Sequence, residues 1–288
     1  MGTSLTYDPA VLARLHKMEL DILNDVDALC KKYDIAWFAL GGCCIGAFRH
    51  GGFIPWDDDI DICMLRADYD KFLQVAEDDA AFRRKYRLVI PGKEPNYPCM
   101  FAKVSLNGTK NMTAELLKAG CQNIGIHMDI FPFDYAPEDT AARKKQAKKA
   151  WLYSKLSYIY HLKNPHIPMD GAAGKLFALA CRILYTLMRL FHVRPARFAK
   201  KYHKVCTAHN HTPTNVITDF TYVRPEDATM RVSEVFPVLR VPFEDTEICV
   251  PTAYDKIMRQ YYGDWMQLPP EDKRKNHPPA VLEFPTEQ

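Results

Sequence analysis

The chain has 288 residues, 48 % of them hydrophobic, which is enough to bury a substantial core and excludes a disordered or low-complexity protein. Its nine cysteines are irregularly spaced and contain no Cys-x-x-Cys pair, which excludes a zinc site of that kind and favours free thiols in a reducing cytosol. The net charge of +3 conceals an asymmetry, because residues 141–204 hold 15 Lys and Arg against one acidic residue (15 − 1 = +14), and the rest sum to +3 − 14 = −11.

Apolar periodicity predicts alternating helices and strands over the first half of the chain. A helical pattern opens at Asp8-Pro9, with apolar residues three and four positions apart, and ends near Tyr33. Ile35–Leu40 is short and apolar and runs into Gly41-Gly42, which predicts a strand followed by a tight turn. The other expected elements are helices at Cys44–His50 and Arg66–Glu77 and strands at Asp59–Met64, Phe101–Leu106 and Gly125–Phe131. This order predicts an α/β fold, with a mixed sheet flanked by helices.

The second half opens with two expected helices. Thr140–Leu162 is basic, and Gly171–Val193 is apolar on nearly all sides apart from three cations that lie close to one line along it. Leu239–Val250 is strand-like, Thr252–Trp265 predicts a helix, and the tail after Leu268 is loop-like. We therefore predict a core over residues 1–140, a basic helical insertion over residues 141–204, and a C-terminal part over residues 205–288 that completes the core.

Four carboxylates follow one another closely before the second predicted strand: Asp57, Asp58, Asp59 and Asp61. On a strand, Asp59 and Asp61 point to the same side, about 6–7 Å apart. Two carboxylates at that spacing can share a hard divalent cation. The competing interpretation is an acidic surface turn that contacts nothing, because short motifs of this kind often occur by chance.

Two further features favour a site over a surface turn. Gly41-Gly42 lies at the end of a predicted strand, where bare backbone N–H groups can approach phosphate oxygens. A further carboxylate, Asp129, lies in the strand-like run His127–Phe131. A Gly pair, an Asp-x-Asp motif and a lone Asp on a neighbouring strand form the layout of the nucleotidyltransferase superfamily.

Longer motifs sharpen this similarity. Residues 41–61, with the sequence GGCCIGAFRHGGFIPWDDDID, resemble the signature of the LicD family. The chain also resembles later motifs of this family, in the segments Arg66–Tyr69, Asp129–Asp134, Pro251–Tyr254 and Tyr262–Pro270, followed by Arg274 and His277. Two departures stand out: Cys43-Cys44 replaces the Thr or Ser and the aliphatic residue that usually follow the Gly pair, and Lys103-Val104-Ser105 lacks the Arg of the usual Lys-x-Arg.

The resemblance implies a phospho-alcohol transferase with a nucleotidyltransferase-like catalytic core. Bacterial relatives typically move phosphocholine from CDP-choline to a sugar hydroxyl, and fukutin-type relatives use CDP-ribitol. The expected partners are therefore a CDP-linked donor and a glycan or lipid-linked saccharide acceptor, of the kind built into lipopolysaccharide or teichoic acid. The expected cofactor is Mg²⁺ or Mn²⁺, since phosphoryl transfer needs positive charge over the bridging oxygens.

The motifs assign candidate roles to the site residues, and several of these residues also have a purely structural explanation. Asp59 and Asp61 are assigned to metal binding, and Asp129 is a third ligand or the general base, two roles that the sequence leaves open. Donor phosphates are expected on Gly41, Gly42, Arg49, His50 and Lys103. For Asp57 and Asp58 the favoured role is to cap or orient the turn, and direct contact with metal or substrate is the alternative. The alternatives for the other residues are that Arg49 pairs with a nearby Asp and that Lys103 is a solvated strand-edge lysine.

Two features bear on the alcohol and on the place of the reaction. A quaternary ammonium is held best by aromatic faces, and the candidates, for which a core role is favoured, are Trp56, Tyr69, Tyr261, Tyr262 and Trp265. The apolar helix Gly171–Val193 is either packed on the core, the favoured reading, or lies at a membrane interface, with the basic residues of 141–204 drawn to anionic lipid. No secretory signal pattern opens the chain, so we expect a cytoplasmic protein, with any membrane contact peripheral and at the inner face.

Two other functions compete with this one. Ordinary members of the superfamily transfer a nucleotidyl group from an NTP and release pyrophosphate, whereas a phospho-alcohol transferase releases CMP. A nucleic-acid-binding protein would use the basic segment and bind in a strongly salt-dependent manner. We expect no nucleic-acid partner, because the segment has no recognised nucleic-acid motif and the carboxylates repel phosphate unless a metal is present.

Overall fold

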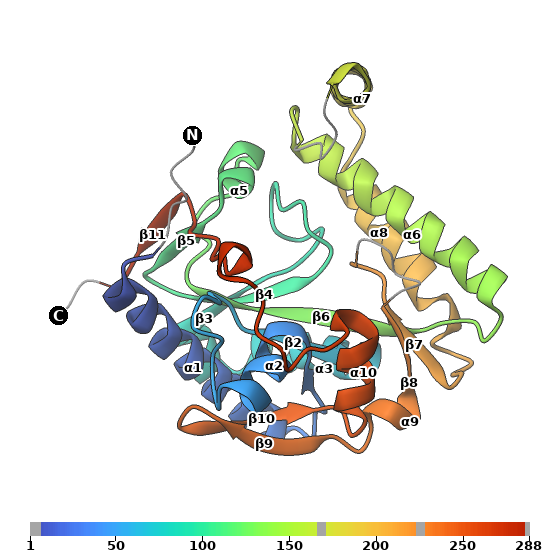
Figure 1. Cartoon of the computed structure of the whole chain (residues 1–288). Helices are drawn as coiled ribbons and strands as arrows, with labels where there is room; N and C mark the ends of the chain where they lie inside the picture. The colour runs from blue at the N-terminus through green and yellow to red at the C-terminus, as the bar shows by residue number, and fades with distance from the viewer. Residues whose placement is uncertain (1–6, 166–170, 223–227, 286–288) are drawn as a thin grey trace.

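A computed structural model describes residues 7–165, 171–222 and 228–285 (Figure 1). Its main sheet runs in the order β1 (Phe38–Ala39), β2 (Asp61–Leu65), β6 (His127–Tyr135), β4 (Ala102–Leu106) and β3 (Tyr86–Val89). The far end of β6 also pairs with β7 (Val216–Asp219), which pairs with β8 (Thr229–Arg231). β2 and β6 are parallel, and the other neighbours are antiparallel. This sheet confirms the predicted mixed α/β fold.

The remaining elements of the body surround this sheet. They are the helices α1 (Pro9–Lys32), α2 (Gly41–Arg49), α3 (Arg66–Asp78), α4 (Ala80–Lys85), α5 (Ala114–Ala119), α9 (Val232–Val235) and α10 (Tyr254–Tyr262), the hairpin β9 (Leu239–Phe243) and β10 (Thr246–Val250), and the pair β5 (Lys110–Met112) and β11 (Val281–Glu283). α1 starts where the sequence predicts, since the Asp8 carboxylate caps it and Pro9 occupies its first turn. Its apolar side, with Leu15, Ile22 and Val26, is fully buried in the core.

Three further helices form an arm beside the body, α6 (Thr140–His161), α7 (Gly171–Leu190) and α8 (Ala196–Cys206) (Figure 1). α6 and α8 lie side by side, held by buried side chains such as Ala150 and Cys206 and by the Gln146 amide, which donates to the Val205 carbonyl over 2.8 Å. α7 contacts α6 at the far end of the pair. β6 leads into the arm and β7 returns from it, so the chain re-enters the sheet beside the strand from which it left.

Three local predictions are wrong in detail. Gly41-Gly42 is the first turn of α2, since the helix begins at Gly41 and follows a strand of only two residues. β2 begins at Asp61, so Asp59 lies on the preceding loop and does not alternate with Asp61 on a strand. The tail is not all loop, because Val281–Glu283 pairs with β5.

Candidate active site

The register of three neighbouring strands brings the predicted polar residues together. Asp61 on β2 lies opposite Asp129 on β6, and Asp129 lies opposite Lys103 on β4. Residues opposite one another in a sheet project from the same face, so the three side chains form a row across β2, β6 and β4. The Lys103 ammonium lies 2.6 and 2.8 Å from the two oxygens of Asp129.

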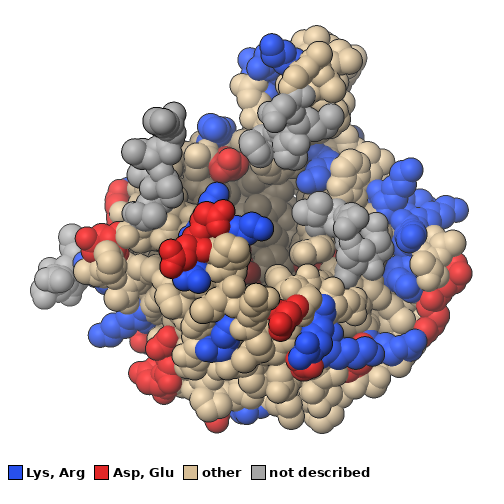
Figure 2. Space-filling model, viewed as in Figure 1, with Lys and Arg blue, Asp and Glu red and all other residues tan. Residues whose placement is uncertain are grey.

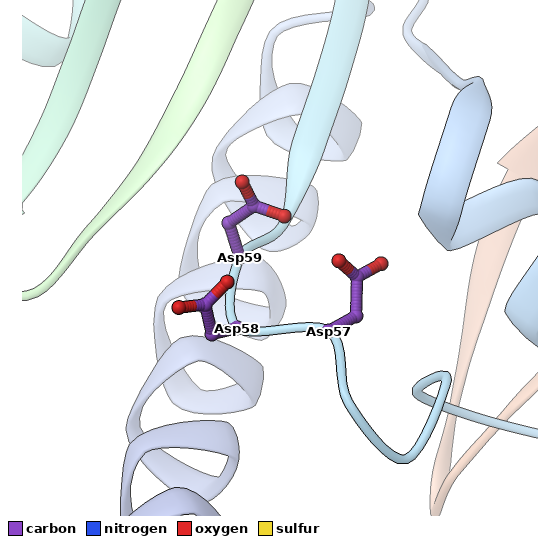
Figure 3. Close-up of side chains that lie close together, drawn as sticks. All are labelled: Asp57, Asp58 and Asp59. Carbon is purple, nitrogen blue, oxygen red and sulfur yellow. The ribbon is translucent and has the colours of Figure 1, made fainter. Parts of the chain in front are cut away.

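The loop before β2 adds a second group of carboxylates beside this row. Asp57, Asp58 and Asp59 follow one another on the loop that enters the strand (Figure 3). Each offers an oxygen within 4.8 Å of the other two, which is an arrangement that can hold a metal ion. The sequence prediction put Asp57 and Asp58 in a turn-orienting role, whereas the geometry places both beside Asp59.

Burial and like charge disfavour ionisation of these groups. Loss of hydration raises the pKa of Asp61 well above its usual range, and the charges of Asp59 and Asp129 raise it further. Burial, reinforced by Asp58, raises the pKa of Asp57 to about 6. Partial loss of hydration within the cluster and the charge of Asp57 also raise the pKa of Asp59, although this residue remains exposed to solvent. Such perturbed carboxylates in one place are typical of a functional site.

One oxygen of this group lacks any partner among the described residues. The Oδ1 atom of Asp61 is buried and accepts no hydrogen bond. A buried, unsatisfied carboxylate oxygen is costly, and a cation within reach would remove the cost. Hard carboxylate oxygens are also the ligands that Mg²⁺ and Mn²⁺ prefer, so the residues present fit such an ion.

Asp58 is fixed by the two ends of the chain. The backbone N–H of His277 donates to Asp58 Oδ2 over 3.1 Å, and the Tyr7 hydroxyl donates to the same carboxylate. The His16 ring reaches the carbonyl of Asp57 at 2.8 Å and stacks on Phe53, with ring centroids 3.8 Å apart. The acidic loop is therefore held from several sides.

Glu19 is a site residue that the sequence interpretation missed. It lies on the buried side of α1 and is 1 % exposed, and its Oε2 atom has no hydrogen-bond partner among the described residues. Burial raises its pKa well above the usual range, and the charges of Asp59 and Asp58 add to this. The sequence does contain a signal for Glu19. This acid lies on the same side of the helix as the apolar residues Leu12, Leu15 and Ile22, where another apolar residue is expected.

The Gly pair brings helix α2 close to the acidic loop. A Cβ atom on Gly42 would lie 2.1 Å from an oxygen of Asp57, so only glycine allows this approach. Gly41 has a φ of +57° and would place a Cβ atom 3.2 Å from the Tyr262 hydroxyl. The C-terminal motif therefore lies directly over the start of α2, where bare N–H groups and the helix dipole favour an anion.

The alternative prediction for Lys103, a solvated lysine at the edge of a strand, is wrong. It is 6 % exposed, and its ammonium is bonded to Asp129. Beside it, burial lowers the pKa of His127 to about 4, and the Lys103 charge lowers it further, so this imidazole is neutral at physiological pH. A buried lysine next to the carboxylate row supplies a fixed positive charge at the site.

Within the described residues, Arg49 does not pair with the aspartates of the acidic loop. Its guanidinium donates to the backbone carbonyls of Trp265 at 2.8 Å and Gln267 at 3.3 Å, and to the His50 ring at 3.0 Å. Arg274 lies over the Trp56 ring, 5.2 Å from its centroid. Loss of hydration lowers the pKa of Arg49, and the charge of Arg274 contributes, which indicates two neighbouring arginines. Cations thus gather beside the loop that carries the acids.

An aromatic cavity of about 170 Å³ opens next to Asp61. Tyr222, Tyr261 and Tyr262 line it together with Phe131, Phe133 and the carboxylate of Asp219. The remaining lining residues are Leu40, Gly41, Asp61, Cys63, Ala228 and Met258.

The cavity separates the aromatic candidates into two groups. Tyr261 and Tyr262 line it, whereas Tyr69 and Trp265 are buried in the core, at 3 % and 4 % exposure, and Trp56 lies beside Arg274. Tyr222, which the sequence interpretation missed, joins the first group. The cavity therefore combines three tyrosines with buried negative charge.

Comparisons with known proteins agree with this geometry. Residues 34–169 match the family model described as LicD/FKTN/FKRP, nucleotidyltransferase domain. The chain is 28 % identical over 273 residues to the Lipopolysaccharide cholinephosphotransferase LicD of Haemophilus influenzae. This alignment covers 90 % of this chain and 92 % of that protein. It is also 37 % identical over 54 residues to the uncharacterized protein RT0683 of Rickettsia typhi, covering 19 % of this chain and 18 % of that protein. With the Gly pair, the acidic loop and Asp129 gathered at one end of the sheet, the domain match shows that residues 34–169 contain a nucleotidyltransferase domain of the LicD type, and the chain as a whole is similar to a LicD protein.

Proposed function

We propose that this protein transfers phosphocholine, or a closely similar phospho-alcohol, from a CDP-linked donor to a hydroxyl of a glycan and releases CMP. The observation that carries the proposal is the aromatic cavity next to Asp61. Tyrosine faces attract a quaternary ammonium, and the buried Asp219 adds negative charge. The phosphorus that carries the alcohol would then lie beside the acidic loop, and the relative in Haemophilus influenzae has a name that describes the same transfer.

The metal ligands that we propose are Asp59 and Asp61, with Asp57 beside them. These carboxylates would hold a divalent cation, which would supply positive charge to the donor phosphates and to the leaving CMP. The start of α2 at Gly41-Gly42 offers N–H groups to phosphate oxygens. His50 is the C-cap at the other end of this helix, where its ring lies beside Trp56.

Proton transfer is assigned to the row across the sheet. The oxygen of the acceptor hydroxyl attacks the phosphorus, the bond from phosphorus to the CMP oxygen breaks, and Asp129 accepts the hydroxyl proton. The Lys103 ammonium, 2.6 Å from Asp129, holds that carboxylate in place. Arg49 holds the Trp265–Gln267 segment and thereby the C-terminal motif over α2.

We place the reaction in the cytoplasm, with a lipopolysaccharide-type glycan as acceptor. The helical arm is proposed to contact the inner membrane face, where a lipid-linked acceptor would be found. The catalytic part is proposed to comprise residues 1–140 and 205–288, with residues 141–204 as an insertion.

Product analysis tests the proposal directly. The purified protein is incubated with Mg²⁺ and with CDP-choline, CDP-ethanolamine, CDP-ribitol or CTP, each with a deacylated lipopolysaccharide acceptor. We expect CMP from CDP-choline and choline phosphate on the glycan. Pyrophosphate from CTP, with no CMP from any CDP-alcohol, would instead establish nucleotidyl transfer and refute the proposal.

A variant of the cavity tests the cargo. Tyr261→Leu removes one aromatic face, and we expect KM for CDP-choline to rise about 3–30-fold, since a cation–π contact contributes about 0.5–2 kcal/mol. Tyr33→Leu, at the C-cap of α1 and not among the residues that line the cavity, is the matched control and should leave KM unchanged. If both variants keep the wild-type KM, the cavity does not bind the choline group.

A further inference from the structure

Helix α7 presents an unpartnered apolar stripe to solvent. Leu176, Leu179, Ile183, Leu187 and Leu190 are separated by three, four, four and three residues, which places them on one side of a helix with 3.6 residues per turn. Leu176 is 69 % exposed and Leu190 is 65 % exposed. An amphipathic helix in a soluble protein ordinarily turns such a stripe toward the core.

The opposite side of α7 is the side that packs on α6. Gly174, Cys181 and Met188, spaced by seven residues, are its buried residues. The cations lie on a flank between the two sides, where they bind α6: Arg182 donates to Asn164 over 2.8 Å, and the Arg189 guanidinium lies 4.4 Å from the centroid of the Tyr160 ring. The arm thus fixes α7 with its apolar stripe directed outward, contrary to the favoured reading of a helix buried against the core.

The contacts of α7 with its neighbouring helices bear on whether this helix crosses a bilayer or lies on its surface. Within the described residues, α7 is the one helix that is long and apolar enough to span. A crossing would put its two ends on opposite sides of a hydrocarbon layer of about 30 Å. Yet α6, before α7, and α8, after it, pack on each other, and only five residues separate Leu190 from Ala196. α7 also contacts the end of α6 and the residues just after it through Arg189 and Arg182, and these contacts to the helix pair favour a helix that lies along the bilayer surface over one that spans it.

We propose that the stripe of α7 lies in the interface of an anionic lipid bilayer and that it docks the enzyme on the membrane. Charge complementarity selects this occupant over a second copy of the chain, because residues 141–204 carry a net charge of +14 whereas the other residues sum to −11. In Figure 2 the surface over α7, at the top, is mostly uncharged, while lysines and arginines gather on the side formed by α6. Among the cations of α6, Lys144 and Lys148 are exposed.

Other large apolar side chains of the arm are also exposed. Phe177 and Phe191 of the α7 region are 50 % and 73 % exposed, and Trp151 and Leu152 of α6 are 42 % and 48 % exposed. Apolar and aromatic side chains beside cations are the composition of helices that bind at the interface. The inference does not depend on the proposed function, because it requires lipid binding and no chemistry at the acidic loop.

Vesicle co-flotation tests the docking surface. The full chain is mixed with vesicles of equal parts phosphatidylglycerol and phosphatidylcholine, and with vesicles of phosphatidylcholine alone. We expect flotation with the anionic vesicles, weakened by high salt. The variant Leu176→Glu/Ile183→Glu should lower the bound fraction at least about tenfold, because it puts two charges into the apolar contact.

The matched control changes exposed leucines outside the arm. Leu117→Glu/Leu239→Glu adds the same charge at positions that are 43 % and 40 % exposed, and it should bind vesicles within about twofold of the wild type if position matters more than net charge. Circular dichroism melting checks that both variants fold. CMP release with a water-soluble acceptor should be equal in all three proteins, so a failure of docking is distinguishable from a failure of the proposed reaction.

Two outcomes would overturn the inference. One is a wild-type chain that stays unbound with anionic vesicles at low salt. The other is equal flotation of the α7 variant and the wild type. Light scattering of the lipid-free chain adds a third: a dimer that becomes monomeric in the α7 variant would assign the stripe to a second copy.

Discussion

Replacing Asp219 by asparagine should make the protein more stable at neutral pH and less able to bind its donor. Asp219 ends β7, is 8 % exposed and lines the aromatic cavity. Its oxygens accept from the Thr221 N–H at 2.7 Å and the Thr221 hydroxyl at 2.9 Å, bonds that an asparagine can largely retain. Burial nevertheless raises its pKa from 3.8 to about 6, so the ionised form is disfavoured in the native state.

The pKa shift fixes both the sign and the upper limit of the effect. Since the native pKa exceeds the unfolded value, the native state binds more protons between these values, and this group makes stability fall as pH rises from about 4 to about 6. The total fall is roughly 3 kcal/mol, from about 2 pKa units at 1.36 kcal/mol each. Asp219→Asn removes this fall, so we expect a gain of about 1–3 kcal/mol above pH 7 and none below pH 4.

Urea unfolding from pH 4 to pH 8 measures the effect as the difference between variant and wild type, because other carboxylates contribute equally to both. Asp78→Asn, an exposed carboxylate at the end of α3, is the control and should leave the free energy of unfolding unchanged at every pH. In the same variant we expect KM for CDP-choline to rise severalfold. A stability difference that does not vary with pH would refute the reasoning about burial, and an unchanged KM would remove Asp219 from the cation site.

Three other substitutions test the site and its support. Asp61→Asn should raise the melting temperature of the metal-free chain, because it removes an unpartnered buried charge, and should abolish stabilisation by Mn²⁺ in thermal melts and CMP release. Lys103→Met should lower kcat at least about tenfold with little change in KM for the donor, since it leaves Asp129 without its cation. Arg66→Met should lower the free energy of unfolding by about 3–5 kcal/mol in urea, because it leaves Asp134 buried and unpaired.

The sequence could predict the parts of the site that local patterns encode. The alternation around Asp61 and the strand-like run around Asp129 both became strands, and a parallel register places the two residues opposite each other. The predicted strand before Gly41 is longer than the observed one, and the glycine pair is typical of a turn. In the structure Gly41 is instead the first residue of α2, where its φ of +57° is accommodated. Local pattern therefore gave the elements, and the boundaries depended on backbone geometry that the pattern does not carry.

The missed residues share one physical reason. Glu19, Tyr222 and Asp219 reach the site from α1 and from the end of β7, elements that are distant in the chain from the acidic loop. Nothing in their own neighbourhood requires an acid or an aromatic residue there, and only the tertiary packing shows what they face. Lys103 was among the predicted phosphate-binding residues, but its burial could not be predicted from the sequence, because only the fold shows that β4 lies inside the sheet, between β3 and β6.

Hydrogen bonds at the base of the arm join it to the strands that carry the active-site carboxylates. Asp134 accepts two bonds of 2.9 Å from Arg66, the residue that follows β2, and a third of 2.7 Å from Asn210, which lies just beyond α8. Asn210 also accepts from the backbone N–H of Tyr135 over 2.9 Å. The strand that carries Asp61 and the strand that carries Asp129 are thus clamped at the root of the arm. A membrane contact at α7 would therefore set the orientation of the acidic loop relative to the bilayer, and softening this clamp should impair transfer to a lipid-linked acceptor more than transfer to a soluble one.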